Sequence, residues 1–252
     1  MTRKKINLQS PRLPVSKSPR RTDSRPVLHR ARLVVPISQP AIEDGAVVVA
    51  GGAILDVGPF QLLRRQWLGA PARDHDETVL LPALINAHAH LDLSGLAGQV
   101  KPQGSMAEGF RSLLALRETL DEDHLEEARA LTLDSLPTFG TGLVGDIISS
   151  GVFPGGLPND MIITQTFVEV FGLHNQSLEV AIDQLPPAAR NLLVDGQESV
   201  SLAAHAPYTT SAPLLKQIKQ WGTARGKVIS GHAAESEEEI HFLHSGLGPL
   251  RD

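Results

Sequence analysis

The sequence predicts an α/β protein in which a small β-rich domain precedes a parallel sheet. Before residue 81 the apolar runs are short, rich in β-branched residues and separated by turn residues, which is typical of a β domain. After residue 82 apolar strands alternate with amphipathic helices, which indicates βαβ units. We therefore expect a disordered basic leader (1–25), a small β-rich domain (26–81) and a main α/β domain (82–252).

The leader differs from the rest of the chain in charge. Residues 1–25 contain eight basic side chains and one acidic side chain, are rich in Ser, Pro and Arg, and lack the apolar residues for a core. We expect a solvated tail, with a targeting or nucleic-acid-binding arm as the alternative. After residue 25 the chain holds 27 acidic and 15 basic side chains, a net charge of −12. This acidic surface argues against nucleic acid as a partner.

Composition narrows the function classes further. No apolar run approaches the roughly 18 residues that a membrane span needs, and no apolar signal-peptide segment is present. The chain contains no cysteine, which leaves His and carboxylate side chains as metal ligands. We expect a soluble, cytoplasmic enzyme that acts on a small molecule, with no membrane partner.

The β-rich domain is predicted from apolar runs and one glycine pair. Strands are expected at 33–35, 45–50 and 53–57. Gly51 and Gly52 form a tight turn between the last two, so a β-hairpin is expected there. Residues 60–68 are expected to form one or two helical turns, and the polar segment 73–77 is expected to be a loop.

The α/β domain is predicted from its alternating pattern. Strands are expected at 84–90, 142–148, 162–171, 200–205 and 228–232. Helices are expected at 106–120, 122–136, 177–190 and 212–225, with a last helix from Glu237. Pro186 and Pro187 should end or break the third helix. Side chains at the carboxyl ends of these strands should meet at one edge of the sheet, where active sites of parallel barrels lie.

Two histidines end the first of these strands, in Asn86-Ala-His88-Ala-His90. Side chains two residues apart on a strand point to the same face, so both imidazoles project together. Two neutral imidazoles on one rigid edge suit zinc or iron. A His-x-His sequence alone is equally compatible with two structural histidines, because the chain has ten histidines in all.

A second motif, Gly231-His232-Ala-Ala-Glu235, ends the last predicted strand. A carboxylate three residues after a metal-binding histidine can take a proton from an activated water and pass it to a leaving group. The alternative is a glutamate that stabilises a helix N-terminus. For the three glutamates at 237–239 we prefer this alternative and expect a solvated first turn.

A third motif begins at His205, where another strand gives way to a helix. His205 lies at the strand end and is aimed at the same edge, which makes it a candidate substrate-binding residue. Thr210 or Ser211 is expected to cap the following helix. Tyr208 is the only tyrosine, and no role is predicted for it. Asp146 ends the second strand, and we expect it to cap a loop rather than bind a metal.

These three motifs, in this order, resemble those of the amidohydrolase superfamily, specifically its cytosine-deaminase-like and adenosylhomocysteine-deaminase-like metal-dependent aminohydrolases. Their strand reads Pro-Gly-Leu-Ile-Asn-(Ala/Thr)-His-x-His, and Pro82 to His90 matches it except that Ala83 replaces the glycine. The segment from Asn86 to Ser94 also resembles the aminodeoxyfutalosine deaminases. The resemblance covers nearly everything after residue 26. It implies a (β/α)8 TIM-type barrel preceded by a small β-sandwich domain.

The resemblance also implies roles for the motif residues. His88, His90 and His232 would hold one divalent metal ion, with Zn2+ as the first choice and Fe2+ as the alternative. Glu235 would be the catalytic proton carrier, and His205 would bind the substrate, a nucleoside-like or heterocyclic ring. The family carries two more active-site residues, a His on the sixth barrel strand and an Asp on the eighth.

The length after Ile85 accommodates about five of the eight barrel strands, because each βα unit takes roughly 30 residues. We therefore expect a partial barrel, which is either truncated at its C-terminus or completed by a partner chain, and no deamination by this chain alone. Open sheet edges favour self-association, so a homo-oligomer is a further expectation. The favoured reaction is hydrolytic deamination at a carbon–nitrogen bond that is not a peptide bond. The alternatives are ring-amide or dechlorinating hydrolysis and a non-catalytic metal-binding or vestigial protein.

Overall fold

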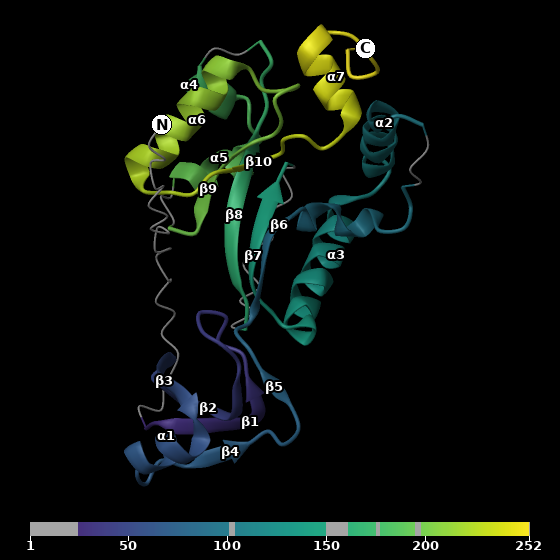
Figure 1. Cartoon of the computed structure of the whole chain (residues 1–252). Helices are drawn as coiled ribbons and strands as arrows, with labels where there is room; N and C mark the ends of the chain where they lie inside the picture. Colours follow the sequence, from purple (N-terminus) through teal and green to yellow (C-terminus); the bar gives the residue numbers. More distant parts are fainter. Residues whose placement is uncertain (1–24, 101–103, 150–160, 175–176, 195–197, 252) are drawn as a thin grey trace. The chain divides into compact units, whose positions relative to one another are not determined.

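The structure is a computed structural model that describes residues 25–100, 104–149, 161–174, 177–194 and 198–251. The predicted disordered leader lies outside the described residues except for Arg25. The chain divides into two compact units, Met1–Ala83 and Leu84–Asp252, which are described separately (Figure 1). Within the described ranges, none of the helices has the length and apolar character that crossing a bilayer requires.

The first unit is built on one five-stranded sheet with the order β3-β2-β1-β4, in which β5 also pairs with β1. Its strands are β1 (Val27–Val34), β2 (Ile42–Ala50), β3 (Ala53–Pro59), β4 (Ala72–Asp74) and β5 (Val79–Leu80). The strands β2 and β3 form the predicted antiparallel hairpin, and Gly51 and Gly52 turn it with φ angles of 59° and 75°. Helix α1 (Phe60–Gln66) buries Leu63 in the same apolar cluster as Leu28.

Two features of this unit differ from the prediction. The first strand begins at Val27, well before the predicted range 33–35. The segment 73–77 is not a loop throughout, because Ala72–Asp74 pairs in parallel with Leu28–Arg30. This edge strand is exposed along its whole length, so it needs no apolar residues and escapes hydrophobic-pattern reasoning. The described strands form a single sheet, and the sandwich stays a prediction.

The second unit contains the predicted parallel sheet. Its strands are β6 (Leu84–Ala89), β7 (Thr141–Ile148), β8 (Ile163–Val170), β9 (Val200–Ala204) and β10 (Ser230–Gly231). Every neighbouring pair is parallel, in the order β10-β9-β8-β7-β6. The sheet curls like a barrel wall, because His88 Nδ1 on β6 lies 3.2 Å from Ser230 Oγ on β10 across the three intervening strands. The predicted α/β class is confirmed.

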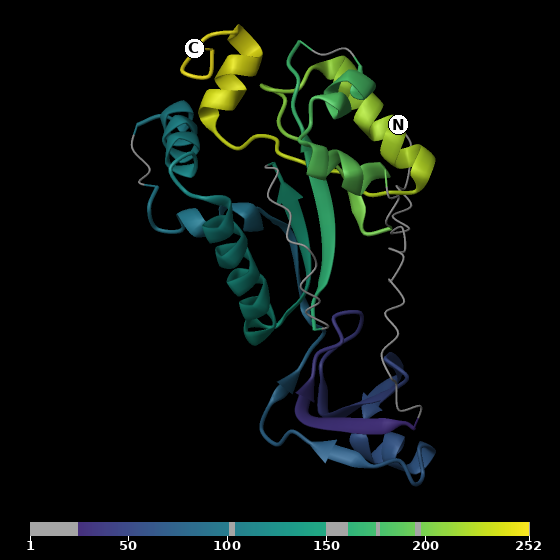
Figure 2. The same cartoon turned by 180° about the vertical axis from the view of Figure 1, so that it is seen from behind.

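Helices follow the strands as the pattern predicts, and α3 runs alongside β6 and β7 (Figure 1 and Figure 2). They are η1 (Leu91–Leu96), α2 (Met106–Arg117), α3 (Glu122–Ser135), η2 (Leu136–Phe139), α4 (Leu178–Asp183), α5 (Pro187–Val194), α6 (Ala212–Arg225) and α7 (Glu237–Ser245). The helix expected at 177–190 is two helices, because Pro186 and Pro187 interrupt it. The main core packs Leu202 of β9 with Leu214 of α6. Side-chain oxygens cap four helices, from Ser105, Asp121, Ser211 and Ser236.

Two glycines allow strands of this unit to approach closely. A Cβ on Gly145 in β7 would lie 2.3 Å from the carbonyl oxygen of Ala87. A Cβ on Gly231 in β10 would lie 2.5 Å from the carbonyl oxygen of Ala204. Glycine therefore fits at both positions without moving the neighbouring backbone. Both contacts adjoin histidine-bearing strand ends, so these glycines help to set the spacing of the histidines.

Candidate functional site

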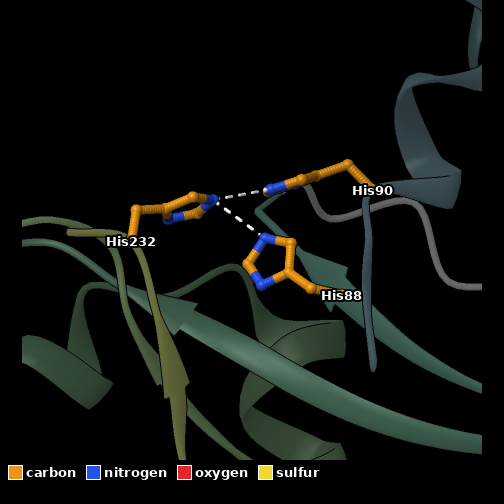
Figure 3. A group of neighbouring side chains, drawn as sticks. All are labelled: His88, His90 and His232. Carbon is orange, nitrogen blue, oxygen red and sulfur yellow. Dashed lines mark hydrogen bonds between the residues drawn. The ribbon is translucent and has the colours of Figure 1, made fainter. Parts of the chain in front are cut away.

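Three histidines from the two outer strands converge at the carboxyl edge of the parallel sheet (Figure 3). His88 and His90 lie at the end of β6, and His232 follows β10 directly. The Nε2 atom of His232 lies 3.0 Å from Nε2 of His88 and 3.1 Å from Nε2 of His90. The structure thus brings together the three residues predicted as metal ligands, with one nitrogen of each ring turned toward a common point.

Hydrogen bonds on the other side of two rings orient these nitrogens. His232 Nδ1 lies 2.8 Å from the carbonyl oxygen of His205. A carbonyl oxygen only accepts, so Nδ1 carries the proton and Nε2 keeps its lone pair. His88 Nδ1 lies 3.2 Å from Ser230 Oγ, which holds that ring as well. Outer partners of this kind fix the orientation of histidine ligands in metal sites.

Burial keeps the rings of His88 and His90 in the neutral form that binds metals. It lowers the pKa of His90 to about 4, and it is also the largest cause that lowers the pKa of His88. The adjacent ring of His232 lowers both pKa values further. Because a histidine ligand must be deprotonated, neutral rings at pH 7 are ready to coordinate without losing a proton.

The spacing of the nitrogens fits a divalent metal ion. Nitrogens bound at 2.0–2.1 Å in a tetrahedral site lie about 3.3 Å from one another. The two Nε2 separations measured from His232, 3.0 and 3.1 Å, are close to this value. A set of three imidazoles suits zinc and iron(II) better than the oxygen-seeking ions magnesium and calcium.

Glu235 lies beside this cluster, on the wall of a cavity that His90 and His232 also line. It follows Ala234, whose backbone φ of 59° lies in the left-handed region that residues other than glycine rarely adopt. The hydroxyl of Tyr208 donates a hydrogen bond to Glu235 Oε2 at 2.9 Å. Burial, and then the hydrogen bond to Glu235, raises the pKa of the Tyr208 hydroxyl, so it stays a donor. Tyr208, for which no role was predicted, thus fixes one oxygen of the candidate proton carrier.

The expected solvated turn at 237–239 is wrong for Glu239. Its side chain is 1% exposed, and its Oε2 accepts a hydrogen bond from the backbone N–H of Glu235 at 2.7 Å. Glu238 is half-buried, and Glu237 is exposed as expected. Glu239 is the third residue of α7, and its side chain turns back toward the helix N-terminus, where Ser236 Oγ accepts a hydrogen bond from the backbone N–H of Glu239. A run of like charges does not by itself distinguish such an inward side chain from solvated ones.

His205 lies on the wall of a cavity of about 620 Å³. Its ring stacks on Phe171, with 4.6 Å between the centroids. Burial lowers the pKa of His205 to about 4, so the ring is neutral at pH 7. A ligand in this cavity would therefore meet several of the predicted site residues together, namely His90, His205, His232 and Glu235.

Two buried acids at strand ends complete the surroundings. Asp146 contacts the Arg129 guanidinium and accepts a hydrogen bond from the Leu91 N–H at 3.2 Å, so its carboxylate is held by the protein itself. Glu169, for which no role was predicted, ends β8, lines the cavity and is 2% exposed. Its Oε1 lies 3.6 Å from His232 Nδ1 and has no hydrogen bond within the described residues. Glu169 is therefore a buried carboxyl group that faces the candidate site and whose Oε1 is free for a partner in the cavity.

Relatives of known sequence are deaminases, although no protein-family model matches the chain. An aminodeoxyfutalosine deaminase of Deinococcus radiodurans is 29% identical over 221 residues, which are 84% of this chain and 50% of the relative. A 5-methylthioadenosine/S-adenosylhomocysteine deaminase of Pelotomaculum thermopropionicum is 23% identical over 218 residues, which are 82% of this chain and 49% of the relative.

A solved structure extends this result to the fold. The crystal structure of Helicobacter pylori aminofutalosine deaminase in complex with methylthio-coformycin matches with a TM-score of 0.74 and 25% identity, over 88% of this chain and 54% of that chain. The chain resembles the amidohydrolase-superfamily deaminases. The resemblance predicted from the three motifs is confirmed. The chain spans about half the length of the curated relatives it matches.

Proposed function

We propose that this protein is a metal-dependent hydrolase that deaminates nucleoside-like rings. The observation that carries the proposal is the convergence of three imidazole Nε2 atoms at the carboxyl edge of a parallel sheet. The choice of reaction is supported by the relatives, whose names are those of deaminases. The proposed partner is a small nucleoside-like or heterocyclic substrate.

We assign His88, His90 and His232 as ligands of one divalent ion, with zinc as the first choice and Fe2+ as the second. Such an ion would lower the pKa of a bound water toward ~7 and so make a nucleophile available at neutral pH. Water adds to the ring carbon that bears the amino group, the carbon–nitrogen bond breaks, and ammonia leaves. Glu235 takes the proton of the water and delivers it to the departing nitrogen. The neutral His205 ring orients the substrate.

The finer fold assignments belong to the same proposal. Residues 26–81 would form the small β-sandwich, and residues 82–252 would form strands of a (β/α)8 barrel with its active site at the carboxyl edge. We further propose a cytoplasmic location and self-association through open sheet edges. Size-exclusion chromatography coupled to light scattering tests the last point, and a strictly monomeric protein would contradict it.

Metal analysis tests the proposed site directly. The protein is purified, stripped with a chelator, reloaded with zinc and desalted, and its metal content is measured by elemental analysis. We expect about one zinc per chain in the wild type and a loss of zinc in the double variant His88→Ala/His90→Ala. The matched control is His241→Ala/His244→Ala, which removes two exposed imidazoles from α7 and should keep the zinc.

The same preparations test the reaction. Glu235→Gln should retain zinc, because Glu235 is not a proposed ligand. In protein of the length of the relatives it should lower ammonia release from adenosine-type nucleosides by about 10²- to 10⁴-fold, the usual contribution of a general acid–base group. Equal zinc in the wild type and the double histidine variant would contradict the metal assignment. Unchanged ammonia release by Glu235→Gln would contradict the assigned proton carrier.

A further inference from the structure

Glu169 differs from the other buried acids in its hydrogen bonding. Within the described residues, the buried acidic side chains are Asp92, Asp146, Glu169 and Glu239. All except Glu169 accept a hydrogen bond from a backbone N–H group of the chain. Oε1 of Glu169 is buried and accepts none from any described residue. A buried charge without a partner is costly, so this carboxylate is best explained by a cation that the protein binds.

The basic group that Glu169 faces is the ring of His232. Oε1 of Glu169 lies 3.6 Å from Nδ1 of His232. The same Nδ1 donates its hydrogen bond to the carbonyl oxygen of His205 at 2.8 Å. At 3.6 Å the carboxylate is too distant to be a second hydrogen-bond acceptor, but the interaction between charges falls only with the inverse of distance. Glu169 can therefore act on this ring through its charge.

Glu169 is not placed to be a metal ligand itself. It faces Nδ1 of His232, whereas Nε2 of the same ring is turned toward His88 and His90. A neutral imidazole has one N–H and one lone pair, and here Nδ1 holds the proton. Ligand atoms of Glu169, His205 and His232 do lie within 4.8 Å of one another. A metal ion among them would require Nδ1 of His232 to lose both its proton and its hydrogen bond.

The three proposed ligands bring no negative charge to the metal site. Neutral imidazoles around a divalent ion leave both of its positive charges uncompensated. Glu235 is exposed, so water screens its carboxylate, whereas Glu169 is 2% exposed and its charge is screened much less. A carboxylate behind a histidine ligand makes the ring a stronger base, and loss of such a group usually weakens metal binding.

We infer that Glu169 is a positioning residue that supplies a counter-charge for the bound metal ion from behind His232, without coordinating it. The inference rests on the proposed function, because it takes His88, His90 and His232 as the ligands. The carboxylate has two effects: it makes the His232 ring a stronger ligand, and it offsets part of the charge of the ion. This role also explains why a carboxyl group that is costly in the metal-free fold lies at this position.

Zinc affinity tests the role of the charge. It is measured by competition with a chromophoric chelator for the wild type, Glu169→Gln and Glu169→Asp at pH 9. This pH lies above the raised pKa of Glu169, about 8, so the carboxyl group is ionised with or without zinc. We expect Glu169→Gln to bind zinc about 10- to 100-fold more weakly than the wild type. Glu169→Asp keeps the charge and should lose less affinity. A role in shape alone predicts the opposite order, because glutamine keeps the size of glutamate and aspartate does not.

Two further measurements show where the charge acts. The matched control Glu126→Gln removes an exposed carboxylate from α3 and should leave zinc affinity unchanged. The ratio between wild type and Glu169→Gln should persist in about 1 M salt, because salt screens a buried charge little. Cobalt(II) reports on coordination through its visible absorption bands. Glu169→Gln should bind cobalt more weakly but keep the bands of the cobalt-loaded wild type, because the ligands are the same.

The outcomes separate the inference from the proposed function. Equal zinc affinity in the wild type and Glu169→Gln, or weaker binding by Glu169→Asp than by Glu169→Gln, overturns the role of Glu169 while the three-histidine site stands. Altered cobalt bands in Glu169→Gln overturn it as well, because they would make Glu169 a ligand. Absence of zinc binding by the wild type overturns the proposed metal site and the inference together. If Glu169→Gln does not fold, a loss of more than about 100-fold in Glu169→Asp contradicts a charge that acts at a distance.

Discussion

The neighbouring strands β7 and β8 each end in a buried acid, but only one of the two acids is fully held by the protein. The Asp146 carboxylate contacts the Arg129 guanidinium and the Leu91 N–H. The Glu169 carboxylate is buried to a similar degree, yet its Oε1 has no hydrogen bond within the described residues. A carboxylate enclosed by its own chain supports the fold, whereas one that faces a cavity is available to a ligand.

Breaking the buried ion pair between Arg129 and Asp146 should have the largest effect on stability. Arg129→Met leaves the Asp146 carboxylate buried without its counter-charge, and we expect the free energy of unfolding to fall by about 3–5 kcal/mol. Urea denaturation followed by circular dichroism measures it. The control Arg111→Met removes an exposed guanidinium and should change stability by less than about 0.5 kcal/mol. A similar loss of stability in both variants would contradict the prediction that the buried ion pair contributes more than an exposed arginine.

Removing the charge of Glu169 should have a smaller effect on stability, and it should raise the free energy of unfolding rather than lower it. Burial raises the pKa of Glu169 to about 8 in the metal-free protein, well above its ordinary value. The folded state then binds more protons than the unfolded state between roughly pH 4.5 and 8, so stability falls as pH rises through this range. The raised pKa corresponds to a penalty of about 5 kcal/mol for the ionised group at pH 9. The buried amide of a glutamine keeps a desolvation cost of about 1–3 kcal/mol, so Glu169→Gln should stabilise the chelator-treated protein by about 2–4 kcal/mol at pH 9.

The pH profile provides the control for that comparison. Below about pH 4.5 Glu169 is protonated in both states, so the wild type and Glu169→Gln should have nearly equal stability there. Asp146→Asn should instead destabilise at neutral pH, since it leaves the Arg129 guanidinium buried without its counter-charge. Thermal denaturation over a series of buffers measures both variants. A Glu169→Gln protein less stable than the wild type at pH 9 would contradict the contrast between the two acids.

Glu235 is a third acid of this region. Loss of the hydrogen bond that it accepts from Tyr208 should have the smallest effect on stability. Tyr208→Phe removes the hydroxyl that donates to Glu235 Oε2. Because Glu235 is exposed, water replaces the lost donor, and we expect a loss of about 0.5–1.5 kcal/mol in urea denaturation. Zinc content should not change. A loss as large as that of Arg129→Met would mean that the tyrosine hydroxyl is integral to the core.

The convergence of the three proposed metal ligands could be predicted from local signals. Strand periodicity placed His88 and His90 on one face, and the βαβ pattern placed His232 at the same edge. Both signals lie within short stretches of chain. The position of Glu169 could also have been noticed, because a single acid inside the apolar run from Phe167 to Val170 is unusual for a buried strand.

Other features depend on contacts that no local pattern encodes. The inward position of Glu239 depends on a hydrogen bond that its carboxylate accepts from the backbone N–H of Glu235 at the start of α7. The edge strand at 72–74 forms because the first strand offers an unpaired side, not because its own residues favour a strand.

The backbone at Ala234 limits how freely this region can vary. A left-handed conformation costs a residue with a side chain about 1–2 kcal/mol, and glycine would avoid that cost. Glycine also gains conformational freedom in the unfolded chain, which offsets roughly 0.4–1 kcal/mol of the benefit. Fold stability therefore discriminates only weakly between the two residues at this position. Ala234→Gly would therefore leave the fold largely intact and mainly increase the backbone freedom next to Glu235, the proposed proton carrier.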